Sequence, residues 1–197
     1  MKRLIHLVAA VTVLAGCAAP GSIPPGPATT TPAAPTCPPE GVRMRMSDVN
    51  AAMGLRAAGI DLVNCGARTY RVQGYPVVAP LDEDQGPVSV QVLTEVGEIT
   101  GALKHLDVPP QPVVLQPGES ATAVVAWRNK YDDVRNPPVE VASLFVAPEK
   151  GRPAQLVRPD GPLDLGSTGR IGISPWIARK EGPSTSAETT EPAPPLL

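Results

Sequence analysis

The stretch that begins at Asn64-Cys65-Gly66 and ends at Gly74-Tyr75-Pro76 constrains the fold of this chain more than any other feature. The first triplet is typical of a tight turn. It separates the apolar run 60–63 from a run in which Tyr70 and Val72 alternate with other residues, which predicts a β-hairpin. The second triplet predicts another corner, because Gly permits unusual dihedral angles and Pro removes a ladder donor.

Short strand patterns continue on both sides of this stretch. Residues 42–46 alternate apolar and charged side chains, which predicts a strand with Val42, Met44 and Met46 facing inward. The segment 53–63 is rich in Ala, but Gly54 and Gly59 interrupt any helical face, so we expect a strand only at 60–64. Further strands are expected at 69–73, 77–81, 139–147, 155–158, 163–165 and 170–174.

Two more turns predict further hairpins. Asp82-Glu83-Asp84-Gln85-Gly86 precedes a returning strand marked by Val88, Val90 and Val92, and Pro117-Gly118 joins the apolar segments 113–115 and 120–128. No convincing helix separates these strands. The pattern therefore predicts an all-β, antiparallel sandwich rather than an α/β sheet.

Both ends of the chain differ in composition from its centre. Many of the 26 Pro residues lie in 18–36 and 182–197, together with Thr, Ser and Glu. Such segments bury too little apolar surface to fold. We expect one β-sandwich domain at 37–178 and a disordered tail at 179–197.

The first residues predict an export signal. Lys2 and Arg3 precede the apolar run 4–14, and Leu14-Ala15-Gly16-Cys17 resembles a bacterial lipobox. We expect residues 1–16 to be a lipoprotein signal peptide and 17–36 to be a lipidated Cys17 with a Pro/Thr-rich tether. Diacylglycerol and palmitate on Cys17 would anchor the protein to the outer face of the cytoplasmic membrane. An ordinary secretory signal with a chance cysteine is the alternative.

Export also bears on the other two cysteines. With Cys17 lipidated, Cys37 and Cys65 are an even pair in an oxidising compartment, which favours a disulfide over two reactive thiols. The mature chain offers too few Cys and His residues near this pair for a zinc site. The acidic turn at 82–84 lacks the Glu that ends a calcium loop, since Leu93 stands at that position. We expect no metal and no cofactor.

The charge pattern argues against nucleic-acid binding. The chain has 17 Lys and Arg against 19 Asp and Glu, and loss of Lys2 and Arg3 with the signal lowers the formal net charge from −2 to −4. No basic patch is evident. Five arginines are interspersed with apolar residues, and we interpret them as solvent-facing strand positions: Arg43, Arg45, Arg56, Arg68 and Arg71.

Several motifs occur in an order that supports a family resemblance. After the lipobox, the tether and Cys37 come Asn64-x-Gly66, Gly74-Tyr75-Pro76 and Leu115-Gln-Pro-Gly-Glu-Ser-Ala121. This order resembles the actinobacterial lipoprotein family called domain of unknown function 4232, over about residues 37–176. The resemblance implies an immunoglobulin-like β-sandwich in the cell envelope and implies no activity.

The sequence also departs from this family. Tyr70 stands where the family commonly has a Cys, and a further family Cys after the second hairpin is missing. The family's disulfide arrangement therefore does not transfer, and the Cys37–Cys65 pairing rests on the cysteine count.

These features favour a non-enzymatic function. The candidate binding loops are 94–111, which contains His105, and 129–138, which contains Tyr131. The lead hypothesis is a lipid-anchored module that binds an envelope protein or a small molecule. A secreted hydrolase is the alternative, but the sequence has no Gly-x-Ser-x-Gly elbow to pair with His105. A purely structural envelope protein is the third class.

Overall fold

The computed structural model describes residues 36–179. Residues 1–35 and 180–197 lie outside the described residues. The first of these ranges contains the predicted signal peptide, Cys17 and most of the predicted tether, and the second contains most of the predicted tail. Among the described residues the strands are β1 (Val42–Met46), β2 (Asn50–Ala52), β3 (Leu55–Asn64), β4 (Tyr70–Val72), β5 (Val77–Leu81), β6 (Gln91–Leu93), β7 (Val113–Leu115), β8 (Ser120–Arg128), β9 (Glu140–Val141), β10 (Ser143–Ala147), β11 (Gln155–Val157), β12 (Leu163–Asp164), β13 (Arg170–Ile173) and β14 (Ile177–Arg179). A 3₁₀ helix, η1 (Gly101–Leu106), lies between β6 and β7, and no helix in 36–179 has the length and apolar character to cross a membrane.

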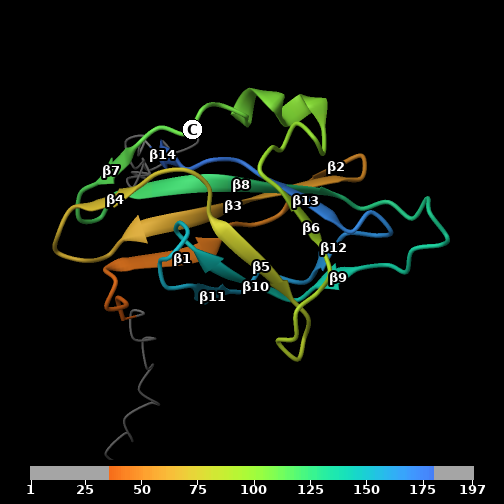
Figure 1. The fold of residues 1–197 in the computed structure, drawn as a ribbon, viewed down its shortest axis with the longest axis horizontal. Coiled ribbons are helices and arrows are strands. Elements are labelled where there is room, and N and C mark those ends of the chain that lie inside the picture. The colour runs from red at the N-terminus through yellow and green to blue at the C-terminus, as the bar shows by residue number, and fades with distance from the viewer. Residues whose placement is uncertain (1–35, 180–197) are drawn as a thin grey trace, which may run out of the picture. The chain divides into compact units, whose positions relative to one another are not determined.

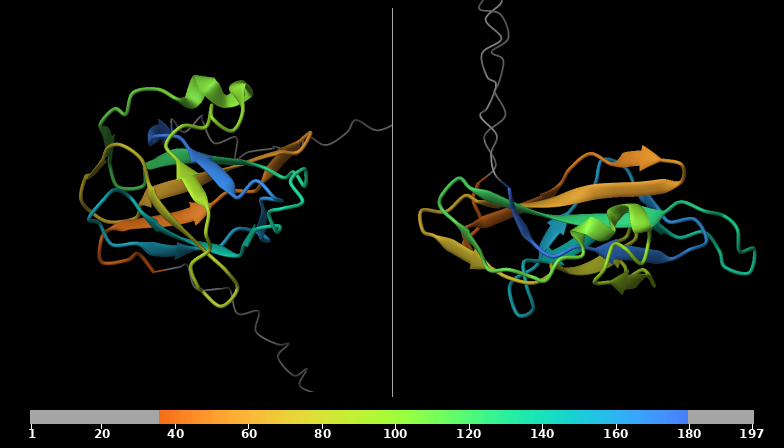
Figure 2. Two further views of the ribbon diagram at one scale, coloured as in Figure 1. Left: turned by 45° about the vertical axis from the view of Figure 1, so that its right-hand side comes forward. Right: turned by 90° about the horizontal axis from the view of Figure 1, so that it is seen from above.

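One large sheet is organised around the long antiparallel pair β3 and β8. Its strand order is β1-β3-β8-β13-β6, with β2 added to β3 and β14 added to β8. The two central strands pair from Leu55 opposite Arg128 to Val63 opposite Ser120. Both views in Figure 2 show them side by side along their length. Their many Ala and Val side chains allow close packing on both faces of the sheet.

Smaller sheets complete the fold. They are β11-β10-β5, β12-β9 and β4-β7. Figure 1 shows β10 and β11 beneath β3 and β8, with β1 at the border between them. One apolar cluster joins these sheets, because buried side chains from all of them belong to it: Val42, Ile60, Leu62, Val72, Val78, Val113, Leu115, Val125, Trp127, Val141, Leu144, Val146, Val157, Leu163 and Ile171.

The side chain of Gln155 joins the two neighbouring sheet edges. Its Oε1 accepts from Met44 N at 3.0 Å, and its Nε2 donates to Val42 O at 2.9 Å. This amide therefore satisfies the outer backbone groups of β1, as a paired strand would. An edge strand of the large sheet is thereby linked to β11, an edge strand of the three-stranded sheet.

The predictions of an all-β, largely antiparallel fold and of an alternating strand at 42–46 are confirmed. Val42 and Met44 are buried, and Met46 packs against the core. One pair departs from the antiparallel rule, because β6 runs parallel to β13.

The predicted hairpins around Asn64-Cys65-Gly66 and Pro117-Gly118 are wrong. The strand before the first turn, β3, pairs with β1 and β8, whereas β4 after it pairs with β7. The second turn joins β7 to β8, which also belong to different sheets. Both turns are therefore crossings between sheets. Local turn chemistry does not distinguish a crossing from a hairpin.

Other strand boundaries also differ from expectation. The strand expected at 60–64 begins at Leu55, because its pairing with β8 outweighs the cost of the internal Gly59. The acidic turn forms as predicted, with Asp82 N bonded to Gly86 O, but the predicted returning strand is limited to a bridge between Leu81 and Pro87, and β6 pairs instead with β13 in the large sheet. The strand expected at 139–147 is divided into β9 and β10, which pair with different sheets.

The Asn64 side chain ties both sheet crossings together. Its Nδ2 donates to Arg68 O and to Leu115 O, each at 2.9 Å, and its Oδ1 accepts from Gly66 N at 3.1 Å. The backbone of Asn64 also bonds to Glu119 O and Gly118 N. The residue is 1% exposed. Every polar group of this side chain is thus used to hold a loop or a turn in place.

A disulfide closes the same end of the fold. Cys37 and Cys65 are bonded, with their Cα atoms 5.6 Å apart and a sequence separation of 28. The bond attaches the segment before β1 to the loop after β3. The pairing predicted from the cysteine count is confirmed.

Replacement of Asn64 by Ala should lower the free energy of unfolding by about 2–4 kcal/mol, because the buried Leu115 carbonyl and the partly buried Arg68 carbonyl lose their donor. Chemical denaturation of the purified protein measures this. The matched control is Asn50→Ala, which removes an exposed Asn from β2 and should change stability by less than about 0.5 kcal/mol. Equal losses in the two variants would contradict the role of Asn64.

Removal of the disulfide should destabilise the domain by about 3–4 kcal/mol, since a loop of this length gains entropy in the unfolded chain. The test is denaturation of wild type and of the double variant Cys37→Ala/Cys65→Ala, each with and without a reducing agent. We expect reductant to weaken the wild type alone. A wild-type midpoint that does not respond to reduction would refute the prediction.

Candidate functional site

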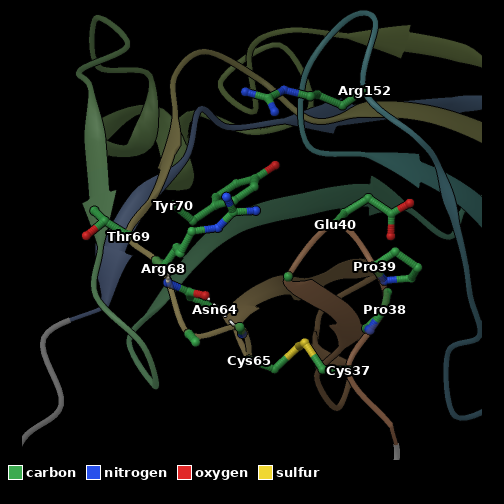
Figure 3. A pocket seen from close by; sticks show the side chains of 13 residues that line it. Cys37, Pro38, Pro39, Glu40, Asn64, Cys65, Arg68, Thr69, Tyr70 and Arg152 are labelled. Carbon is green, nitrogen blue, oxygen red and sulfur yellow. Dashed lines mark hydrogen bonds between the residues drawn. A yellow bond between two sulfur atoms is a disulfide. The ribbon is translucent and has the colours of Figure 1, made fainter.

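Three adjoining hollows lie at the disulfide end of the domain, and Arg152 lines all of them. The largest has a volume of about 580 Å³, and the others have volumes of about 110 and 260 Å³. We call this region the Arg152 site. Its charged and aromatic lining residues are Glu40, Arg68, Tyr70, Arg71, Glu149 and Arg152. Figure 3 shows the disulfide along one side of the largest hollow and Tyr70 between Arg68 and Arg152 on another.

The loop 65–69 positions Arg68. Cys65 is held by the disulfide, and Arg68 O accepts from the buried Asn64 amide. The next residue, Thr69, donates from its hydroxyl to Gln116 Oε1 at 3.0 Å. The backbone that carries Arg68 is therefore tied down on both sides, while its side chain is exposed.

The turn after β10 positions Arg152. Its first residue, Pro148, accepts a 2.6 Å hydrogen bond from the indole of the buried Trp176. Arg152 N donates to Glu149 O, and the Arg152 Nε lies 2.9 Å from Glu149 Oε1. Gly151 has φ of +86°, which allows the turn to reverse there. The turn is thus a rigid support for the guanidinium.

The guanidinium of Arg152 lies over the ring of Tyr70. Its Cζ is 5.6 Å from the ring centroid, within range of a cation–π contact. Burial raises the pKa of the Tyr70 hydroxyl above its usual range, Arg152 opposes that shift, and Glu149 and Glu40 add to it. Tyr70 is therefore a neutral hydrogen-bonding group at physiological pH.

Two arginines of the site are not neutralised from within. In the described part of the chain, the guanidinium groups of Arg68 and Arg71 have no hydrogen-bond or ion-pair partner, whereas Arg152 is paired with Glu149. Guanidinium groups bind planar oxyanions through two parallel hydrogen bonds. The chemistry that these residues offer is hydrogen bonding and charge pairing with a ligand.

The structure places the predicted loop residues elsewhere. His105 is exposed on η1, and Tyr131 is 58% exposed in the loop between β8 and β9. Neither lines the Arg152 site. Figure 1 shows the loop 129–138 at the end of the domain opposite to β4 and β7. His105 and Tyr131 belong to two separate surfaces.

Tyr131 is exposed as expected, but it is not free. Its hydroxyl donates to Asp164 Oδ2 at 2.6 Å. This bond raises the pKa of Tyr131 above its usual range. Burial would raise the pKa of Asp164, but hydrogen bonds from Tyr131 and from Gly166 N hold it below its usual range. The pair fastens the loop to β12.

The acidic turn at 82–84 is a hydrogen-bonded turn. The carboxylate of Asp82 accepts from Gly86 N at 2.7 Å. Within 36–179, no three His, Cys, Asp or Glu side chains are grouped so that they could hold a metal ion.

Sequence reasoning missed the Arg152 site. It assigned Arg68 and Arg71 to separate solvent-facing positions, and it recognised no basic group in the chain. The third arginine lies in a turn after β10, far along the sequence, and meets the other two only because β4 crosses to another sheet. The Asn64-x-Gly66 motif was the available signal, since it marks the loop that carries Arg68.

Substitution of Arg152 by Gln should raise the pKa of Tyr70 further, because the nearby positive charge that favours the phenolate is lost. Glu149→Gln should lower it. NMR titration of the tyrosine ring carbons measures both shifts, with Tyr131 at the opposite end as an internal reference that neither variant should move. A lower Tyr70 pKa in Arg152→Gln would contradict the proposed geometry.

Comparison with known proteins gives one match. No curated protein and no solved structure matches the chain. Residues 37–177 match the family described as domain of unknown function 4232, and this range includes β1 to β13 and every residue of the Arg152 site. Because the match spans most of the chain, the protein belongs to the domain of unknown function 4232 family.

Proposed function

We propose that this protein is an extracytoplasmic lipoprotein, anchored by lipid on Cys17, whose domain is a non-catalytic binding module of the cell envelope. Binding takes place at the Arg152 site. The observation that carries this proposal is the convergence of three hollows on one arginine, with two further arginines at the same site whose guanidinium groups have no partner among residues 36–179. Polar side chains on rigid turns are typical of binding sites carried by a stable scaffold.

The fold that suits this proposal is an immunoglobulin-like β-sandwich. Two observations support this fold. The large sheet and the smaller sheets share one core. The connections from β3 to β4 and from β7 to β8 pass from one sheet to another. Sandwiches of this kind place their loops at the two ends. The strand β4, whose Arg71 lines one of the hollows, and the loop 129–138 lie at opposite ends of the domain (Figure 1), so the two ends are the candidate binding ends.

The site also lies where the proposed tether meets the domain. Cys37, immediately after the tether, lines the largest hollow. A ligand bound there would lie near the attachment to the membrane-proximal segment. This placement suits a component of the envelope itself.

The loops 94–111 and 129–138 are the competing binding surfaces, and a secreted hydrolase or a purely structural protein are the competing functions. The test places a photo-crosslinking amino acid at Ala67, which is exposed and lines the largest hollow, and at Ala51, which is exposed on β2 and lines none of the three. Further probes replace His105 and Tyr131.

We expect a crosslinked envelope component in intact cells from position 67 and none from position 51. Crosslinks from position 105 or 131, without a crosslink from position 67, would assign the binding surface to the loop 94–111 or 129–138 and refute the Arg152 site. Identical products from all four positions, or none from any, would refute the proposed binding site. Turnover of a substrate that is lost in His105→Ala would refute the non-catalytic function.

Lipid anchoring is tested by Cys17→Ser. This substitution removes the acceptor sulfur, so the protein should move from the membrane fraction to the medium or remain unprocessed. Mass spectrometry of the wild-type N-terminus should show a diacylated Cys17. An unmodified cysteine, or cleavage at another position, would overturn the anchor.

A further inference from the structure

We propose that the Arg152 site binds a ligand with at least two oxyanion groups, carboxylate or phosphate, of which one pairs with Arg68 in the largest hollow and another pairs with Arg71 in the adjoining one. This inference rests on the proposed binding function and adds the chemical class of the ligand. Guanidinium groups recognise both oxyanions in the same bidentate manner.

The arginines of the domain divide into two groups by their partners. Most of those elsewhere are occupied within the fold. Arg45 and Arg179 both lie near Asp61 Oδ2, at 3.4 and 3.2 Å. Arg135 pairs with Asp133, and Arg170 pairs with Glu98. These cations stabilise the protein's own carboxylates, so they are not available to a ligand.

Arg68 and Arg71 differ from this group. They line adjoining hollows that share Arg152, and neither has a side-chain partner among residues 36–179. Arg68 lies two residues before β4 and Arg71 lies in its middle, and Asn64 and Leu115 hold this part of the backbone through hydrogen bonds and strand pairing. The backbone that carries these two arginines is therefore fixed before any ligand arrives, so only their side chains lose conformational entropy on binding.

The local charge favours an anion although the whole chain is acidic. Three arginines and two glutamates line the site, while the formal net charge of the chain is −2. Glu149 is already paired with Arg152. A site with this excess attracts oxyanions and repels cations over short distances.

The position of Arg68 and Arg71 in two different hollows of the site sets the number of anionic groups that the ligand needs. Arg68 lines the largest hollow and Arg71 lines a different one, with Arg152 common to both. A ligand with one oxyanion would engage one hollow. A short chain with two or more would engage both, which is why we assign a ligand of this kind.

The experiment measures binding of hexaglutamate and of linear hexaphosphate to the purified exported chain at low salt, with neutral hexaglycine as the reference peptide. We expect at least one anionic probe to bind and hexaglycine not to bind. Arg68→Gln and Arg71→Gln should each weaken that binding by about tenfold or more, the usual loss when a charged hydrogen bond is removed. The probe that binds distinguishes a carboxylate ligand from a phosphate ligand.

The matched control is Arg158→Gln. Arg158 is exposed, has no side-chain partner among the described residues, and lines none of the three hollows. The substitution Arg158→Gln makes the same change in net charge as the two test variants, and it should alter the affinity for the anionic probe by less than about twofold. Unchanged melting temperatures in all three variants show that the fold is retained, as expected for side chains without internal contacts.

Two results would overturn this inference. One is equal loss of affinity in Arg68→Gln, Arg71→Gln and Arg158→Gln, which would mean general attraction by net charge. The other is no binding of either anionic probe. The crosslinking experiment separates this inference from the proposed function. If neither anionic probe binds but position 67 gives a specific crosslink in cells, the anionic ligand is refuted and the binding function stands. If position 67 gives no crosslink either, both are refuted.

Discussion

The buried amide of Asn64 is the interaction on which this end of the domain depends. It donates to Arg68 O and accepts from Gly66 N in the loop after β3, and it donates to Leu115 O at the end of β7, so one side chain links the two sheet crossings. Main-chain polar groups that lose their partners in a buried place cost stability, and sheet crossings expose several of them. A residue with both donor and acceptor atoms on a short side chain is needed here.

The same crossings create the Arg152 site. Because β4 leaves the large sheet and pairs with β7, the loop that carries Arg68 comes beside Cys37 and the turn that carries Arg152. The disulfide and the Trp176 hydrogen bond to Pro148 hold the two sides of the site. Stability and the arrangement of charged groups thus arise from the same few contacts.

Buried charge is handled differently at the centre of the sheet. Asp61 is 3% exposed, and the guanidinium groups of Arg45 and Arg179 both approach its carboxylate. Removal of a carboxylate from water is costly unless cations and hydrogen bonds compensate it. These two arginines therefore serve the fold and help to fasten β14, whereas Arg68 and Arg71 extend into solvent.

Sequence alone determined the features that depend on neighbouring residues or on simple counts. These include the alternating strand at 42–46, the acidic turn at 82–86, the Cys37–Cys65 pair and the all-β class. Tertiary structure decided which strands are partners and hence that Arg68, Arg71 and Arg152 share a site. The physical reason is that alternation specifies which face of a strand is buried, while the choice of neighbour depends on packing between segments that are distant in sequence.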